Sequence, residues 1–118
     1  LYPKANTPGW TVEAQGFRDE FNTFHQNNIE IVGVSADKVS LQKSFSKKQK
    51  LNFDLLSDLD HTMIKAYQAW GLKKFMGREY EGIFRYTYVI NENGVIELAY
   101  HKVKTKTHAQ DIINDLNL

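Results

Sequence analysis

The stretch of this sequence best suited to chemistry is a short turn near its start, NTPGW, which leads into an amphipathic helix. A helix N-terminus presents unpaired N–H groups and positive dipole charge, so a thiol placed there has a lowered pKa and reacts as a thiolate. Residue 10 has this place and is a tryptophan. Pro8 stiffens the turn and Gly9 permits close backbone approach. We expect the Thr7 hydroxyl to point toward residue 10.

Other kinds of reactive site find little support in the sequence. The chain has no cysteine, which excludes disulfides, thiolate metal sites and thiol chemistry for the sequence as it stands. No nucleophile elbow, phosphate loop or dinucleotide fingerprint occurs. Asp58, Asp60 and His61 are explained more simply as helix-capping residues than as zinc ligands. Surface or capping roles, rather than catalysis or metal binding, are predicted for all four histidines: His25, His61, His101 and His108. We predict no metal and no cofactor.

Length and composition indicate one globular domain over residues 1–118. Hydrophobic residues make up 42% and charged residues 25% of the 118 positions, as in ordinary folded proteins. Fifteen basic and 14 acidic side chains leave a net charge of +1, which argues against a nucleic-acid partner. No apolar run approaches the roughly 20 residues that cross a bilayer, so no membrane partner is predicted. Because the sequence begins with Leu1, we expect a processed or truncated chain.

Hydrophobic periodicity predicts alternating helices and strands. Apolar residues at helical spacing indicate a helix over residues 11–26, and a β-branched run indicates a central parallel strand over 29–37. Ser40 is the predicted cap of a short helix that dissolves into the basic run after Ser46. An extended piece at 53–58 follows, and then a helix that Asp60 caps and Gly71 ends.

The last part of the chain is predicted to contain a hairpin and a closing helix. A polar connection over residues 73–82 leads to strands at 84–90 and 95–103, joined by the turn NENG and paired antiparallel. Thr107 and Gln110 form a capping-box pattern before the final helix. The opening LYP fits the end of a strand whose earlier residues we expect to be missing. The predicted fold is a mixed α/β sheet with helices on both faces.

Several stretches together resemble one protein family over nearly the whole chain. They are YPKANTPGW, TVEAQGFRDE, VGVSAD, LLSD, YQAWGLKKFMGREYEGIFRYTYVINENG and KVKTKTHAQDI. This pattern resembles peroxiredoxins of the bacterioferritin-comigratory, or Q, subgroup. The resemblance implies a thioredoxin-like, three-layer fold and the reduction of hydrogen peroxide and organic hydroperoxides with electrons from thioredoxin. It also implies an antioxidant role in redox homeostasis in the cytoplasm, as a monomer or weak dimer.

The family signature is Pro, three residues, Thr or Ser, two residues, and then the peroxidatic Cys, with a distant Arg completing the pocket. Pro3 and Thr7 match the first two positions and Arg85 matches the Arg. The Cys position holds Trp10, and Gln15 stands where the subgroup often has its resolving Cys. The resemblance therefore implies a peroxidase scaffold that is inactive in this chain, because an indole offers no oxidisable nucleophile.

Three explanations of Trp10 remain open from the sequence. One is an introduced or misread Cys-to-Trp change in an otherwise ordinary peroxidase, and another is a natural pseudoenzyme that keeps the scaffold for binding. In the third, Trp10 only packs against Phe17 or Tyr88. We expect the indole either to fill the peroxide pocket or to force the first helical turn open. If the chain is an interaction module, the aromatic connection from Phe75 to Tyr80 is the predicted contact surface.

Overall fold

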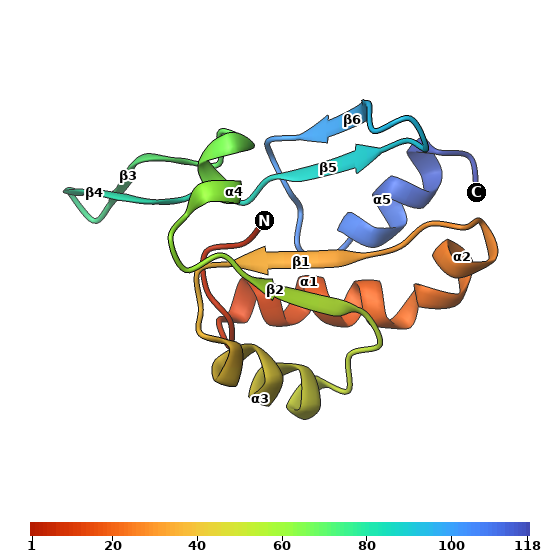
Figure 1. The fold of residues 1–118 in the computed structure, drawn as a ribbon, viewed down its shortest axis with the longest axis horizontal. Coiled ribbons are helices and arrows are strands. Elements are labelled where there is room, and N and C mark those ends of the chain that lie inside the picture. Colours follow the sequence, from red (N-terminus) through yellow and green to blue (C-terminus); the bar gives the residue numbers. More distant parts are fainter.

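The molecule is built from five helices and three pairs of strands (Figure 1). The computed structural model describes residues 1–118. The elements follow one another as α1 (Pro8–Asp19), α2 (Phe21–Gln26), β1 (Val32–Ser35), α3 (Val39–Gln49), β2 (Asp54–Ser57), α4 (Thr62–Ala66), β3 (Trp70–Phe75), β4 (Arg78–Ile83), β5 (Thr87–Ile90), β6 (Ile96–Tyr100) and α5 (His108–Asp115). None of the helices combines the length and the apolar character that crossing a membrane requires.

The strand pairs include both directions, as the sequence predicts. Strands β1 and β2 are parallel, whereas β5 and β6 form an antiparallel hairpin with an irregularity after Val89. The backbone N–H of Tyr2 donates to the Val34 carbonyl at 2.9 Å, and the amino group of Leu1 donates to the Tyr86 carbonyl at 3.0 Å. The LYP stretch therefore lies between β1 and the segment that enters β5, like the end of a strand.

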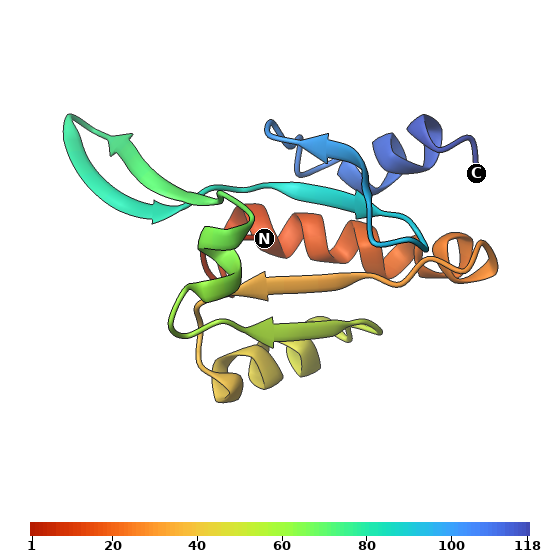
Figure 2. The same ribbon diagram turned by 45° about the horizontal axis from the view of Figure 1, so that its top comes forward.

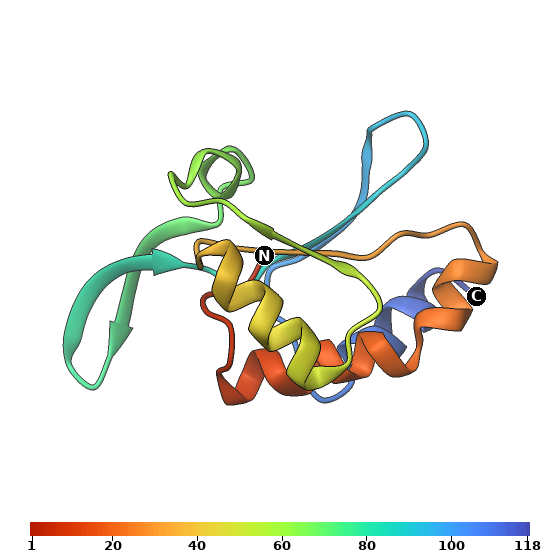
Figure 3. The ribbon, with the colours of Figure 1, turned by 60° about the horizontal axis from the view of Figure 1, so that its bottom comes forward.

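The helices lie on both sides of the β1–β2 pair. Figure 3 shows α1, α3 and α5 on one side of these strands and α4 on the other. The larger core lies between α1, α3, α5 and the strands, and it consists of Tyr2, Ala5, Trp10, Ala14, Phe17, Phe24, Phe45, Phe53, Ala109, Ile112 and Ile113. A smaller cluster joins α4 to β1 and β4: Val34, Ile64, Ala69 and Ile83. The layered α/β arrangement agrees with the sequence prediction.

Gly33 makes the contact between β1 and this core possible. A Cβ atom at position 33 would lie 2.7 Å from Leu55 Cδ2, 3.1 Å from the Tyr2 ring and 3.2 Å from the Trp10 ring. A larger residue at this position would therefore require the Leu55 side chain and both rings to shift away from the strand.

The predicted helix over residues 11–26 is wrong in its bounds, because it is divided. Helix α1 begins at Pro8, whose missing N–H costs nothing in the first turn. Glu20 leaves the helical conformation, with φ −96° and ψ 8°, and α2 starts after it. The break allows Phe24 to pack on Phe17, with ring centroids 6.0 Å apart. Tertiary packing therefore overrides a continuous helical pattern.

Helix α3 is longer than predicted at both ends. It begins after Lys38 without a side-chain cap, so Ser40 lies inside the helix rather than capping it. It also continues through Lys47 and Lys48, because cations in the last turn are favoured by the helix dipole. The helix ends at Lys50, which has a left-handed φ of 54°.

Helix α4 is shorter than predicted, and the expected connection over residues 73–82 is a hairpin. Asp58 accepts a hydrogen bond from the Ile64 N–H at 2.7 Å, and Asp60 accepts a weaker one from the Thr62 N–H at 3.2 Å. Trp70 begins β3 instead of continuing the helix. The turn between β3 and β4 places Met76 and Gly77 at φ 52° and 77°, the two left-handed residues of a tight hairpin.

The closing helix α5 begins after Thr107 as predicted, but the capping box does not form. The Thr107 hydroxyl donates to Asp111 at 3.0 Å instead of capping a backbone N–H. The Gln110 amide pairs with Asn114 on the exposed side of the helix. Asp111 thus competes successfully for the hydroxyl that the pattern assigned to the cap.

A buried polar network holds the turn before α1 against β1 and α3. The Tyr2 hydroxyl donates to Gln42, and the Gln42 amide donates to the Ser35 hydroxyl at 2.9 Å. Ser35 donates to Asp37 at 2.7 Å, and the same Asp37 oxygen accepts the Ala5 N–H at 2.7 Å. The chain of bonds therefore connects the residues on either side of Pro3 to the end of β1.

Replacing Gln42 by leucine should break this network. The Gln42→Leu change leaves the Tyr2 hydroxyl and the Leu56 carbonyl without their partner, and each unpaired buried group costs about 1–3 kcal/mol. We expect a loss of about 3 kcal/mol in the free energy of unfolding, measured by urea denaturation. The control is Gln110→Leu, the same substitution at an exposed position, which should change stability by less than about 0.5 kcal/mol. Equal losses in both variants would contradict the network's role.

Candidate active site at the start of helix α1

The turn before α1 leads directly into the helix, and the Thr7 side chain makes its hydrogen bond within the turn. Thr7 is the N-cap residue with φ −103° and ψ 153°, and its carbonyl accepts the Thr11 N–H at 2.9 Å. The Thr7 hydroxyl donates to the Lys4 carbonyl at 2.8 Å. Because its hydrogen is engaged, this hydroxyl has only its lone pairs left for a further hydrogen bond. Pro3 is half-buried at the beginning of the same turn.

The structure brings Arg85 to this turn from 75 or more residues away. Its Nη2 would lie 3.1 Å from a Cβ atom at Gly9, so the guanidinium rests against the first turn of α1. The Thr105 methyl group lies on the same glycine at 3.7 Å. Gly9 therefore provides space for the guanidinium beside the helix N-terminus, where two sources of positive charge meet.

Glu13 is a member of the site that the sequence analysis missed. Its carboxylate accepts a hydrogen bond from Arg85 Nη1 at 2.9 Å, and only 4% of the residue is exposed. Burial raises the pKa of Glu13, and the Arg85 guanidinium opposes this rise without cancelling it. The available signal was an acid one helical turn after position 10 on a face that is otherwise apolar. The ion pair fixes the direction of the guanidinium.

Trp10 lies in the core, and the first turn of α1 stays closed. The indole is 3% exposed and stacks on Tyr2, with ring centroids 3.8 Å apart and planes inclined by 7°. It also contacts Phe45 and Phe53, at centroid distances of 6.3 and 6.5 Å. The expectation of an opened turn is therefore wrong, because the ring enters the space that Gly33 leaves. The indole N–H has no hydrogen-bond partner.

Gln15 lies apart from the turn. Its amide donates to the Gln49 side chain at 2.9 Å and so connects α1 to the end of α3. Of the positions singled out from the sequence, Pro3, Thr7, Trp10 and Arg85 gather at the start of α1, whereas Gln15 faces the neighbouring helix. This arrangement can stabilise negative charge through the guanidinium and the helix N-terminus, but no side chain in it is a nucleophile.

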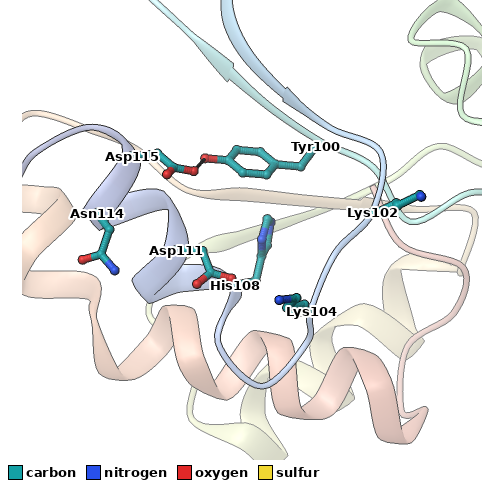
Figure 4. A pocket seen from close by; sticks show the side chains of 7 residues that line it. All are labelled: Tyr100, Lys102, Lys104, His108, Asp111, Asn114 and Asp115. Carbon is teal, nitrogen blue, oxygen red and sulfur yellow. Dashed lines mark hydrogen bonds between the residues drawn. The ribbon is translucent and has the colours of Figure 1, made fainter.

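A polar cavity lies beside α5, apart from the turn before α1 (Figure 4). It has a volume of about 310 Å³ and its lining includes Tyr100 and His108. The Tyr100 hydroxyl donates to Asp115 at 2.6 Å, and a His108 ring nitrogen bonds to the Thr87 hydroxyl at 2.9 Å. His108 is only 2% exposed, contrary to the surface role predicted for it, and burial lowers its pKa to about 4. It therefore stays neutral near pH 7 and packs edge-on against Phe17.

Comparisons with known proteins agree with the resemblance. Residues 1–99 match the AhpC/TSA family. The chain is 41% identical over 114 residues to peroxiredoxin Bcp of Escherichia coli K12, which covers 97% of this chain and 73% of that protein.

Solved structures with the same fold include PrxQ of Xylella fastidiosa, in a mutant form. It superposes with a TM-score of 0.93 at 36% identity, over 98% of this chain and 72% of that one. The bacterioferritin comigratory protein of Xanthomonas campestris, studied for alkyl peroxide reduction, gives 0.92 at 34% identity, over 98% and 74%. These likenesses confirm the predicted thioredoxin-like fold.

The unpaired indole N–H suggests a test of what Trp10 contributes to stability. Trp10→Phe keeps an aromatic ring against Tyr2 and removes the indole N–H. The smaller ring buries less apolar surface, which costs about 1–2 kcal/mol, and removing the unpaired buried donor regains about 1–3 kcal/mol. We expect its free energy of unfolding to stay within about 1 kcal/mol of the parent, whereas Trp10→Ala should lose about 3–5 kcal/mol. Urea denaturation measures both. If both variants lost a similar free energy of unfolding, the unpaired indole N–H would not be destabilising the parent protein.

The raised pKa of Glu13 predicts a pH-dependent contribution to stability. The folded chain holds the Glu13 proton to a higher pH than the unfolded chain does. The stabilisation of the folded chain by this proton is therefore present below the ordinary pKa of 4.5 and is lost as pH rises through the folded pKa. Glu13→Gln removes the titration. The stability of this variant relative to the parent should therefore increase from about pH 4 to about pH 7 in urea denaturation. The control is Glu92→Gln, the same substitution at an exposed position, and parallel curves for the two variants would contradict the assignment.

Proposed function

The chain belongs to the AhpC/TSA family, and from this premise we propose that the turn before α1 is a thiol-peroxidase site whose attacking position is held by Trp10. The family and the relatives with the same fold are peroxiredoxins. The observation that carries the proposal is the placement of Arg85. Its guanidinium lies against Gly9, the residue before the attacking position, and is held there by Glu13.

The surviving groups suit the chemistry of peroxide reduction. In that reaction a thiolate attacks one peroxide oxygen, so an S–O bond forms while the O–O bond breaks. The thiol becomes a sulfenic acid, and the leaving oxygen takes a proton and departs as water or an alcohol. Arg85 and the first N–H groups of α1 stabilise the negative charge that develops on the separating oxygens. The lone pairs of Thr7 orient a hydroperoxide by accepting its O–H.

Trp10 removes the first step of this reaction. An indole has one N–H donor and no nucleophile that passes through a sulfenic acid, and here it is turned into the core. Loss of a nucleophile costs several orders of magnitude in rate even when its supporting groups remain. The chain as written is therefore inactive as a peroxidase.

The same proposal specifies the reductant and the setting. With glutamine at position 15, no second thiol resolves a sulfenic acid within the chain. A variant with a thiol at position 10 would therefore depend on an external thioredoxin-type reductant. Cytoplasmic location, a monomeric or weakly dimeric state and an antioxidant role stay predictions from the resemblance.

A second candidate function is a binding protein that has kept a peroxiredoxin scaffold. It is favoured by the exposure of aromatic side chains on β3 and β4, where Phe75 is 64% and Tyr80 46% exposed. These side chains lie far from the helix N-terminus along the chain and need no thiol at position 10.

Restoring the thiol tests the peroxidase site directly. Trp10→Cys should consume hydrogen peroxide with thioredoxin and its reductase, and one equivalent of peroxide should add one oxygen atom to the protein mass as a sulfenic acid. Replacing the buried ring leaves a cavity that costs about 3–5 kcal/mol, so circular dichroism must show that the variant is folded at the assay temperature.

The matched control is Trp10→Ser, which creates a similar cavity without sulfur and should leave peroxide untouched. A second variant, Trp10→Cys with Arg85→Gln, should react at least tenfold more slowly, since one charge-stabilising donor is worth about 10²–10³ in rate. A folded Trp10→Cys protein that forms no sulfenic acid would refute the assignment of the site.

A further inference from the structure

The β3–β4 hairpin is an arm that projects from the body of the molecule. Figures 1 and 2 show it extending away from the helices, with its tip in solvent. Large apolar side chains along it are exposed: Leu72 58%, Phe75 64%, Met76 87% and Tyr80 46%. A two-stranded hairpin by itself is only marginally stable in water. An arm with this composition is therefore suited to contact with another molecule.

The register of the hairpin gives the arm two different faces. Lys73 pairs with Tyr80 and Phe75 pairs with Arg78, and paired residues in antiparallel strands point to the same side. These four residues form what we call the cationic face, which carries two basic groups, two aromatic rings and no acid.

The opposite face carries both acidic side chains of the arm, one of which is paired with a lysine. It carries Lys74 and Glu79, whose charged groups lie 3.5 Å apart, and Glu81, which accepts the Trp70 indole N–H at 3.3 Å. By contrast, neither Lys73 nor Arg78 has a carboxylate within 4.0 Å, because the ion pairs of the chain join other residues. The unbalanced positive charge of the arm is therefore confined to the cationic face.

The cationic face has a cavity near the tip of the arm, and Lys73 lies at its other end, next to the body. A cavity of about 440 Å³ is lined by Phe75, Arg78 and Tyr80 of this face and by Glu79 of the opposite face. At the base of the arm, the Lys73 ammonium donates to the Ile83 carbonyl at 2.9 Å. Burial and then the nearby Arg85 guanidinium lower the pKa of Lys73, and Arg85 itself is paired with Glu13 on its other side. A carboxylate placed over Lys73 would relieve the repulsion between Lys73 and Arg85.

We propose that the cationic face of the arm binds an acidic polypeptide segment, with an apolar side chain of the segment seated between Phe75 and Tyr80. The carboxylates of the segment pair with Arg78 and Lys73, and the aromatic rings supply the apolar contact. The segment therefore lies along the arm in the direction of Arg85. The inference does not depend on the chemistry of residue 10.

Two other occupants fit the observations less well. A single-stranded nucleic acid also pairs aromatic rings with cations, but the arm carries Glu79 and Glu81 and the whole chain has a net charge of only +1. Two copies of the chain related by a twofold axis would bring one cationic face against another, with Lys73 and Arg78 repelling their own images. An acidic polypeptide carries charge only at its acidic side chains, so its carboxylates can lie on Lys73 and Arg78 without facing Glu79 and Glu81, and it brings no second cationic face.

The test uses a defined probe, an eight-residue peptide in which glutamates alternate with leucine and phenylalanine. Backbone amide shifts of the ¹⁵N-labelled chain are followed by NMR as the peptide is added, first at low salt and then at about 0.15 M salt, where exposed charges are screened beyond about 8 Å. The comparison ligands are the same peptide with lysine in place of glutamate and an oligothymidylate of eight nucleotides.

We expect the acidic peptide to shift amides of β3 and β4, to bind more weakly as salt is added, and to bind more tightly than either comparison ligand. Arg78→Ser should weaken binding about fivefold and Phe75→Ser about tenfold. The matched control is Lys74→Ser, which removes the same charge from the opposite face and should change the affinity by less than about twofold. Amide shifts of the free variants verify that the hairpin is intact.

Four results would overturn the proposal. They are the absence of shifts in the arm at millimolar peptide, an equal effect of Lys74→Ser and Arg78→Ser, tighter binding of the oligothymidylate, and arm shifts that change on dilution of the protein alone. The last two results would identify a nucleic acid or a second copy as the occupant. None of them bears on peroxide reduction by the Trp10→Cys variant, so the two proposals fail independently.

Discussion

The buried ion pair between Glu13 and Arg85 is the interaction on which the candidate site depends. It joins residues 72 positions apart and brings the segment before β5 against the first helix. A guanidinium with 21% of its side chain exposed is held in one direction by a carboxylate that is almost completely buried. Removing either partner leaves an uncompensated charge in the interior, which is far more costly than the pair is stabilising. Both the candidate site and the packing of α1 therefore require that Glu13 and Arg85 remain paired.

Position 10, unlike Glu13 and Arg85, is occupied by a residue that does not suit a site for negative charge. In a thiol peroxidase this position has to present a small, ionised group at the positive end of the helix. Here it holds a large ring that stacks on Tyr2 and fills the space above Gly33. Compared with a small thiol at position 10, the Trp10 ring buries more apolar surface and has an indole N–H without a partner. The surrounding groups still favour negative charge, whereas the residue itself now belongs to the core.

The body and the arm are stabilised in different ways. The body buries a continuous aromatic and aliphatic core between α1, α3, α5 and the strands, together with the polar network around Gln42. The arm has no core beyond its base, and its side chains are divided by strand alternation into a face with two acids and one lysine and a cationic face without acids. Close packing keeps the site rigid, while the arm can present its side chains to another molecule without disturbing that packing.

Much of the fold followed from the sequence because local patterns agree with the tertiary structure there. The β-branched run gave β1, the NENG turn gave the β5–β6 hairpin, and the family signature indicated that Arg85 and the turn before α1 belong together. Predictions were wrong where long-range contacts outweigh local signals. Glu20 interrupts a regular helical pattern so that Phe24 can reach Phe17, and residues 73–82, which look like a polar connection, pair as strands.

The sequence by itself determined which residue types are available at position 10 and therefore which chemistry is absent, since no spatial arrangement supplies a thiol that the chain lacks. Only the tertiary structure decided that the indole turns inward, that Glu13 is the partner of Arg85, and that Lys73 and Arg78 share one face. These facts depend on contacts between segments far apart in the chain or on strand register. Hydrophobic periodicity carries no information about either, because it specifies which face is buried and not what that face meets.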